Sequence, residues 1–211
     1  MCNSKDKFIN LGFSIKKRTY DILYGIGIGL LIMSIGYALL LSCGEISFNN
    51  INFDLSDILF SIIIFTLVAI VEETLIRGYV LKNLMLSFDK YIALIISSLL
   101  FATLHLANPN MNFLSFLDLF LAGIFLGISY IYTKNLWFPI ALHFSWNLFQ
   151  SFLGFNVSGQ DMYSIIEFKI KENNILNGGD FGFEGSIFSI IFQLIFIVIF
   201  YYYFRKQDVI N

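Results

Sequence analysis

The sequence predicts an all-α protein, a polytopic bundle of about six transmembrane helices, on three observations. Hydrophobic residues make up 57% of the 211-residue chain and charged residues only 13%, against about 25% charged in soluble domains. The mean hydropathy is +0.76. The apolar residues gather into runs, most of them close to the roughly 20 residues that cross a bilayer. So little charge means that most of the surface faces lipid, and we expect a multi-pass protein of the cell membrane.

Six apolar runs mark the expected spans. They cover residues 22–41, 58–82, 91–106, 114–132, 136–153 and 187–204. We expect one transmembrane bundle over residues 22–204, between a cytoplasmic segment (1–21) and a cytoplasmic tail (205–211). Close helix contacts in a bilayer favour small residues, and the first span carries four glycines: Gly25, Gly27, Gly29 and Gly36.

The charges of the connections give the orientation of the bundle. Basic residues fall at the N-terminus, at Lys82 and Lys90, at Lys134 and at the C-terminal end, whereas acids dominate residues 42–57 and 154–186. Cytoplasmic loops carry the excess of lysine and arginine, so both termini are expected inside. A net charge of −2 offers no basic field for nucleic acid. The oligomeric state has no sequence signal.

The most informative stretch is Ile70–Arg77, which places Glu72, Glu73 and Arg77 inside the second span. Each charge near the bilayer centre costs about 2.5–3.5 kcal/mol, so intramembrane charges usually have a function. Glu73 and Arg77 are i and i+4 on a helix, in the favoured order for an ion pair. Glu72 is rotated by about 100° and is expected to face a cavity. On this motif alone, an ion cluster that locks helices together explains the charges equally well.

Two histidines provide further candidates, and both fall within expected spans. His105 follows Phe101 by four residues, and His143 precedes Asn147 by four, which places each pair on one helical face. Polar groups in spans face the bundle interior or a wet cavity, so we expect these groups and the glutamates to converge. At 1.5 Å per residue, Glu72 and His143 lie about 11–15 Å from the inner ends of their spans, but His105 about 20 Å.

A carboxylate beside two imidazoles suits hydrolysis by an activated water. The carboxylate takes the proton, and imidazole and amide donors stabilise the oxyanion on an attacked carbonyl. Neither Cys2 nor Cys43 lies within this set as a nucleophile. Glu72, His105 and His143 could instead bind zinc, although the His-Glu-x-x-His spacing is absent. From the residues alone, a metal-free site and a zinc site both stay open.

Three motifs carry a resemblance to a known family. Glu72-Glu73-x-x-x-Arg77-Gly78, Phe101-x-x-x-His105 and His143-x-x-x-Asn147 resemble those of the CAAX protease and bacteriocin-processing family (CPBP, or Abi) of intramembrane endopeptidases. That family includes the type II CAAX prenyl endopeptidase. The similarity covers residues 58–152, which we expect to be the protease core.

The resemblance implies a helical bundle around a conical chamber and a role for each motif residue. Glu72 would be the water-activating base of a glutamic peptidase that requires no cofactor, with zinc as the alternative. His105 would assist it, with Glu73 and Arg77 as support. His143 and Asn147 would stabilise the oxyanion. Phe101 would support the site. The expected partners are the lipid bilayer and a peptide or membrane-protein substrate, in bacteriocin self-immunity, in processing of membrane or secreted peptides, or with CAAX-type substrates.

Two other functions stay open. A non-enzymatic immunity protein could bind a peptide or its receptor without cleaving it. A proton-coupled transporter could use the same polar groups together with Asp118 of the fourth span, although no inverted repeat is visible. We expect Asp118 to be an interfacial group near the outer mouth of the bundle.

Overall fold

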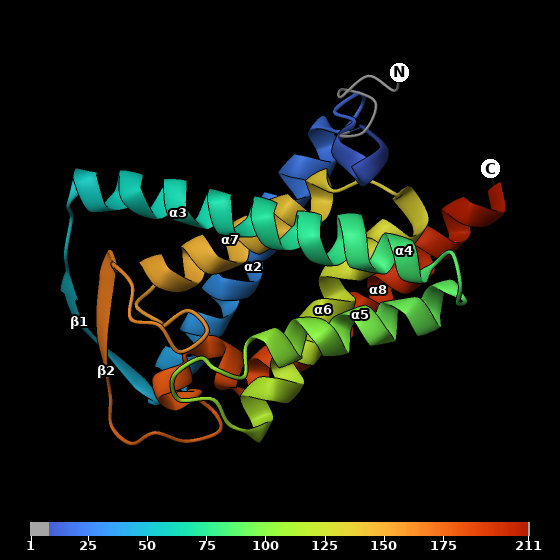
Figure 1. Cartoon of the computed structure of the whole chain (residues 1–211). Coiled ribbons are helices and arrows are strands. Elements are labelled where there is room, and N and C mark those ends of the chain that lie inside the picture. The colour runs from blue at the N-terminus through green and yellow to red at the C-terminus, as the bar shows by residue number, and fades with distance from the viewer. Residues whose placement is uncertain (1–8, 211) are drawn as a thin grey trace.

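The computed structural model describes residues 9–210 and has a helix at each of the six expected spans (Figure 1). The elements in chain order are η1 (Ile9–Phe13), α2 (Thr19–Ser42), β1 (Ile46–Ile51), α3 (Leu55–Glu73), η2 (Thr74–Leu81), α4 (Lys82–Leu84), α5 (Lys90–Leu104), α6 (Phe113–Thr133), α7 (Trp137–Phe152), β2 (Ile166–Ile170), η3 (Gly179–Phe181), η4 (Phe183–Gly185) and α8 (Ile187–Ile210). The expected helical bundle is confirmed.

Four helices are long and apolar enough to cross a membrane within the described chain. They are α2, α6, α8 and a continuous helix over Leu55–Leu84. This last helix consists of α3, η2 and α4. The other two, α5 and α7, have 15 and 16 residues and are shorter than a span of about 20 residues. α7 is buried along most of its length, so neighbouring helices rather than lipid cover it.

A short two-stranded sheet is the main feature that the sequence did not predict. β1 and β2 come from the two longest acidic connections and pair antiparallel, with Ile46 opposite Ile170 and Ile51 opposite Ile166. The ladder is irregular between Phe48 and Asn50. The sheet therefore ties the chain before α3 to the chain after α7 at one end of the bundle (Figure 1).

Glycines bring α2 against α7. A Cβ atom at Gly29 would lie 2.1 Å from the Ser145 hydroxyl, and one at Gly25 would lie 2.8 Å from the Ala141 side chain. The expected close contact is therefore present at these two positions. The prediction of a close helix contact is wrong for Gly27, where a Cβ atom would meet nothing within 4 Å.

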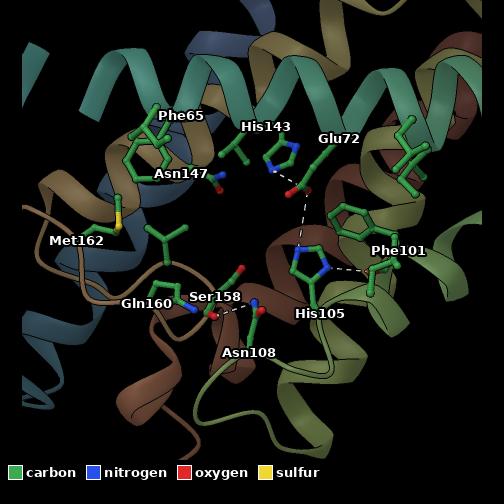
Figure 2. Close-up of a pocket in the computed structure, with 16 residues that line it drawn as sticks. Phe65, Glu72, Phe101, His105, Asn108, His143, Asn147, Ser158, Gln160 and Met162 are labelled. Carbon is green, nitrogen blue, oxygen red and sulfur yellow. Dashed lines mark hydrogen bonds and ion pairs between the residues drawn. The ribbon is translucent and has the colours of Figure 1, made fainter. Parts of the chain in front are cut away.

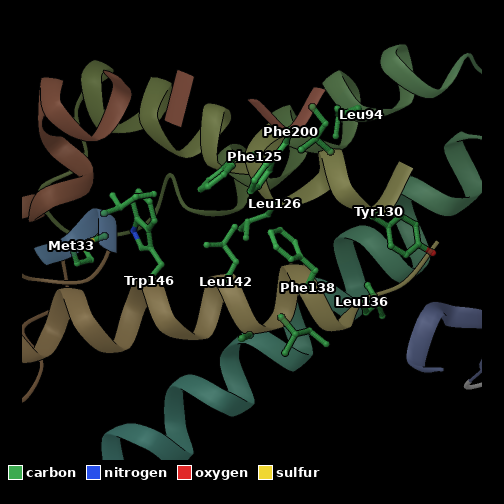
Figure 3. Packing of buried hydrophobic residues seen from close by; sticks show 14 of the residues in the cluster. Met33, Leu94, Phe125, Leu126, Tyr130, Leu136, Phe138, Leu142, Trp146 and Phe200 are labelled. Carbon is green, nitrogen blue, oxygen red and sulfur yellow. The ribbon is translucent and has the colours of Figure 1, made fainter. Parts of the chain in front are cut away.

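Aromatic side chains fill the space between α6, α7 and α8 (Figure 3). The ring of Phe200 lies 5.4 Å from Phe125 and 5.3 Å from Phe138, and Phe125 also meets Trp146 edge-on at 6.3 Å. Offset and edge-on pairs of this kind add about 0.5–1.5 kcal/mol each beyond the area they bury. This cluster holds α7, which carries His143 and Asn147, in a fixed position.

Asp118 lies near the start of α6, at the end of the helix where the outer mouth is expected. It is fully buried there, close to Ser189 and Gln193 of α8 and to Glu184, because α8 and the η4 turn cover this face of α6. Its position at the membrane interface stays a prediction.

Candidate active site

The candidate site begins where the long second helix changes its winding. α3 ends at Glu73, and Thr74–Leu81 continue as a π-helix. π-helical turns are rare and often occur at functional sites. Glu72 and Glu73 are thus the last residues of the regular α3 helix, and Arg77 lies on the widened turn that follows.

Glu73 is the centre of a buried ion network. Its side chain is fully enclosed, and one oxygen, Oε1, accepts from Nη1 of Arg77 at 2.6 Å and contacts Nδ1 of His143 at 2.9 Å. A carboxylate oxygen can only accept, so Nδ1 of His143 carries the proton in this contact. The nitrogen of His143 that remains for other partners is Nε2.

Arg77 and Phe101 connect this network to α5 and α6. Nη2 of Arg77 donates to the Gly123 carbonyl at 3.0 Å, and its guanidinium lies 4.7 Å above the Phe101 ring. The Phe101 carbonyl lies 2.8 Å from Nδ1 of His105. The Phe101 ring also packs against the rings of His105 and His143, at 4.7 and 6.2 Å. Phe101 therefore fixes both imidazoles.

Glu72 lies beside His143 and faces His105 across the cavity (Figure 2). Its Oε2 lies 3.9 Å from Nε2 of His105 and 4.0 Å from Nε2 of His143. These distances are too long for direct hydrogen bonds and fit one bridging water. A carbonyl can only accept, so Nδ1 of His105 carries hydrogen, and Nε2 of the neutral ring is an acceptor.

A cavity of about 370 Å³ lies in front of these groups, within the usual range for ligand pockets. Its wall comes from α3, η2, α5, α7 and the chain after α7. The lining residues are Ile64, Phe65, Val68, Glu72, Leu75, Ile76, Phe101, Leu104, His105, Asn108, His143, Asn147, Val157, Ser158, Gln160 and Met162. In the described chain the Asn147 amide forms no hydrogen bond, and it points into the cavity (Figure 2).

The comparison with known families bears directly on this cavity. Residues 54–149 match the family model described as type II CAAX prenyl endopeptidase Rce1-like. This segment is an Rce1-like domain. It covers just under half of the chain, includes all three motifs, and confirms the family that the motifs indicated. No curated protein and no solved structure matched the chain.

The matched model describes a family of membrane-embedded peptidases. Four apolar helices long enough to cross a bilayer agree with that setting. The structure brings Glu72, His105, His143 and Asn147 to one cavity, with Glu73, Arg77 and Phe101 directly behind them.

The sequence predicts that His105 lies deeper in the bundle than Glu72, but in the structure the two side chains meet. His105 caps the C-terminal end of α5 rather than lying within a span. Nε2 of His105 lies 3.9 Å from Oε2 of Glu72. The two helices are antiparallel neighbours, so His105 and Glu72 reach similar depths.

One wall of the cavity lies outside the Rce1-like domain and was missed by sequence reasoning. The turn Val157–Gln160 is held in place by several bonds. Ser158 donates through its N–H and its hydroxyl to Oε2 of Glu184, at 2.7 and 2.8 Å, and its carbonyl accepts from Asn108 at 3.0 Å. Ser-Gly at 158–159 signals a turn, but nothing in the sequence places that turn beside Glu72.

Glu72, His105 and His143 have side chains of the types that bind zinc, but the distances between their ligand atoms are too long for a zinc site. Within the described residues, no group of three or more His, Cys, Asp or Glu has a metal-binding arrangement. Tetrahedral zinc with bonds of about 2.0–2.1 Å separates its ligand atoms by roughly 3.3 Å, less than the 3.9 and 4.0 Å found around Glu72. Glu72, His105 and His143 would have to close together to bind the ion.

Proposed function

We propose that this protein is an intramembrane endopeptidase of the cell membrane that uses Glu72 to activate a water molecule. One observation carries the proposal: the free oxygen of Glu72 faces Nε2 of both His105 and His143 at 3.9 and 4.0 Å, on the wall of a cavity large enough for a peptide segment. A single water at this point reaches all three groups.

The hydrogen-bond assignments orient that water. It donates one hydrogen to the Glu72 carboxylate and the other to Nε2 of His105, so its lone pair is directed at a peptide carbonyl in the cavity. As the water oxygen bonds to the carbonyl carbon, its proton passes to Glu72. Glu72 then delivers this proton to the amide nitrogen, and the C–N bond breaks. No covalent enzyme intermediate and no cofactor are required.

His143 and Asn147 supply the donors for the oxyanion. The Asn147 amide is free of protein partners in the described chain and faces the cavity. His143 is held through Nδ1 by Glu73, whose charge stabilises an imidazolium with Nε2–H directed toward the substrate. Donors fixed in this way are worth about 10²–10³ in rate each.

We infer that the substrate is an apolar peptide or a segment of a membrane protein. The cavity is lined mainly by aliphatic and aromatic residues apart from its catalytic wall. The composition of the chain, rich in Phe, Ile and Asn, favours self-immunity against a bacteriocin, or processing of a secreted peptide, over cleavage of prenylated proteins.

Reconstitution in liposomes with a peptide library tests the proposal. Wild type should cleave at least one peptide, Glu72→Ala should cleave none, and a chelator should leave cleavage unchanged. Glu172→Ala, at an exposed acid, is the matched control and should keep full activity. Loss of cleavage with the chelator would favour zinc. Full activity of Glu72→Ala would contradict the role of Glu72.

The same variants separate an enzyme from a non-enzymatic immunity protein. If the protein only sequesters a peptide, a Glu72→Gln variant keeps its protective effect in cells exposed to that peptide. An enzyme loses protection with this change, because the amide cannot take the proton from water.

A further inference from the structure

The chain from Gln160 to Ser164 follows one wall of the cavity before it enters β2. Gln160 and Met162 line the cavity, whereas the Tyr163 hydroxyl is turned toward β1 and α3, where it contacts the Asn52 carbonyl and the Asp54 N–H, both at 2.8 Å. Side chains that alternate in this way indicate an extended backbone. This wall is therefore a strand-like segment that is not part of the sheet.

Gln160 pairs both its backbone groups with Val157, at 2.9 and 3.0 Å, and the segment after it is held against α7 by two bonds. The Tyr163 carbonyl accepts from Ser151 of α7 at 2.6 Å, and the Ile165 N–H donates to the Phe152 carbonyl at 3.1 Å. Successive residues of an extended chain direct their polar groups to opposite sides. Met162 and Ser164 therefore face away from α7, and within the described chain their N–H and C=O groups form no hydrogen bond.

β1 leaves the position that would pair with this edge. The Asn52 N–H donates to the Ile165 carbonyl at 2.9 Å, and the chain then turns into α3 at Leu55. Met162 lines the cavity, and Ile64, Phe65 and Val68 of α3 line the same cavity. Unpaired N–H and C=O groups along an extended edge are a template for another strand.

We propose that residues 161–164 form the strand against which the substrate peptide pairs. The proposal rests on the proposed function. The substrate backbone would lie extended between this edge and Ile64, Phe65 and Val68 of α3, with main-chain bonds to Met162 and Ser164. Strand addition of this kind gives affinity through the backbone and specificity through alternate side chains. Gln160 and Met162 would then contact every second residue of the substrate.

A peptide cleaved by wild type is the probe for the first test. A series of variants of this peptide is made, each with a single N-methylated backbone amide. The affinity of each variant for the reconstituted Glu72→Gln protein is then measured. Pairing predicts that binding falls about tenfold at every second amide over the paired stretch and is unchanged at the amides between. Equal affinities for all the methylated peptides would overturn the proposed pairing but not the proposed peptidase activity. If wild type cleaves no peptide, the proposed function fails, and the pairing with it.

Proline substitutions test the same edge from the side of the protein. Met162→Pro removes the N–H that faces the substrate and should raise KM about tenfold with little change in kcat. Asp161→Pro, whose lost N–H points the other way, controls for the proline itself. Melting temperatures confirm that the variants are folded. Equal KM values for Met162→Pro and Asp161→Pro, both with native melting, would overturn the pairing.

Discussion

Two adjacent glutamates have different surroundings at the centre of this site. Glu73 is enclosed and contacts Arg77 and His143, whereas Glu72 is about one-third exposed and faces the cavity. The rotation of about 100° between neighbours on a helix produces this division. One carboxylate can therefore hold the site together while the other stays free to react.

The structural role of Glu73 can be measured as a loss of stability. Glu73→Ala leaves the fully buried Arg77 without its 2.6 Å partner and should lower the free energy of unfolding by about 3–5 kcal/mol. Denaturant unfolding in detergent measures the change. The double variant Glu73→Ala/Arg77→Met should recover much of the loss, because no buried charge remains. A loss below about 1 kcal/mol for Glu73→Ala would show that the pair is not needed for folding.

Asn147 offers a test of oxyanion stabilisation that leaves folding intact. Its amide has no protein partner in the described chain, so Asn147→Ala should change stability little and lower kcat about 10²–10³-fold, with KM nearly unchanged. Steady-state kinetics in liposomes measures both constants. Asn173→Ala, at an exposed loop asparagine, is the control. A kcat within about threefold of wild type would remove Asn147 from the proposed chemistry.

At the scale of elements, the helices were predictable and their details were not. The apolar run at residues 22–41 corresponds to α2 at Thr19–Ser42, and the run at 114–132 to α6 at Phe113–Thr133. The π-helix Thr74–Leu81 has no signature in hydropathy, because its composition is that of any apolar helix. The β1–β2 pairing joins segments more than 100 residues apart and could not be read from either strand alone.

The crossing of α2 and α7 yields a prediction with a matched control on the same helix. Gly29→Ala places a methyl group 2.1 Å from the Ser145 hydroxyl and should destabilise the protein by about 1–3 kcal/mol. Gly27→Ala meets no atom within 4 Å and should be neutral or slightly stabilising, since alanine favours a helix. Thermal unfolding in detergent compares the two. Equal melting temperatures would contradict the packing.

At the scale of the whole molecule, the sequence predicted which residues meet but not the complete cavity. Intramembrane charges have few stable arrangements, so Glu72, His105 and His143 could be expected to converge. The wall formed by Val157–Met162 depends on how a long connection folds back over the bundle. That is decided by contacts such as Ser158 with Glu184, which leave no pattern in the sequence.

The orientation of the bundle is a whole-molecule prediction that chemical labelling can test. In the structure Gly12 and Tyr201, near the two ends of the described chain, lie toward the end of the bundle that holds Lys134 (Figure 1), as the Leu136–Gly12 bond and the Tyr91–Tyr201 contact show. With Cys2 and Cys43 replaced by serine, Asn110→Cys should react with an impermeant maleimide in intact cells, and Leu86→Cys only after permeabilisation. The reverse pattern would invert the predicted topology.

The central claim is that Glu72 activates the water that hydrolyses the peptide bond. The most direct measurement is the single-turnover cleavage rate of reconstituted Glu72→Gln beside wild type, on one peptide, with binding of that peptide measured in parallel. Loss of the general base predicts a rate at least about 10²–10⁴-fold lower, with the peptide still bound at near wild-type affinity. Cleavage by folded Glu72→Gln within about threefold of wild type would contradict this mechanism.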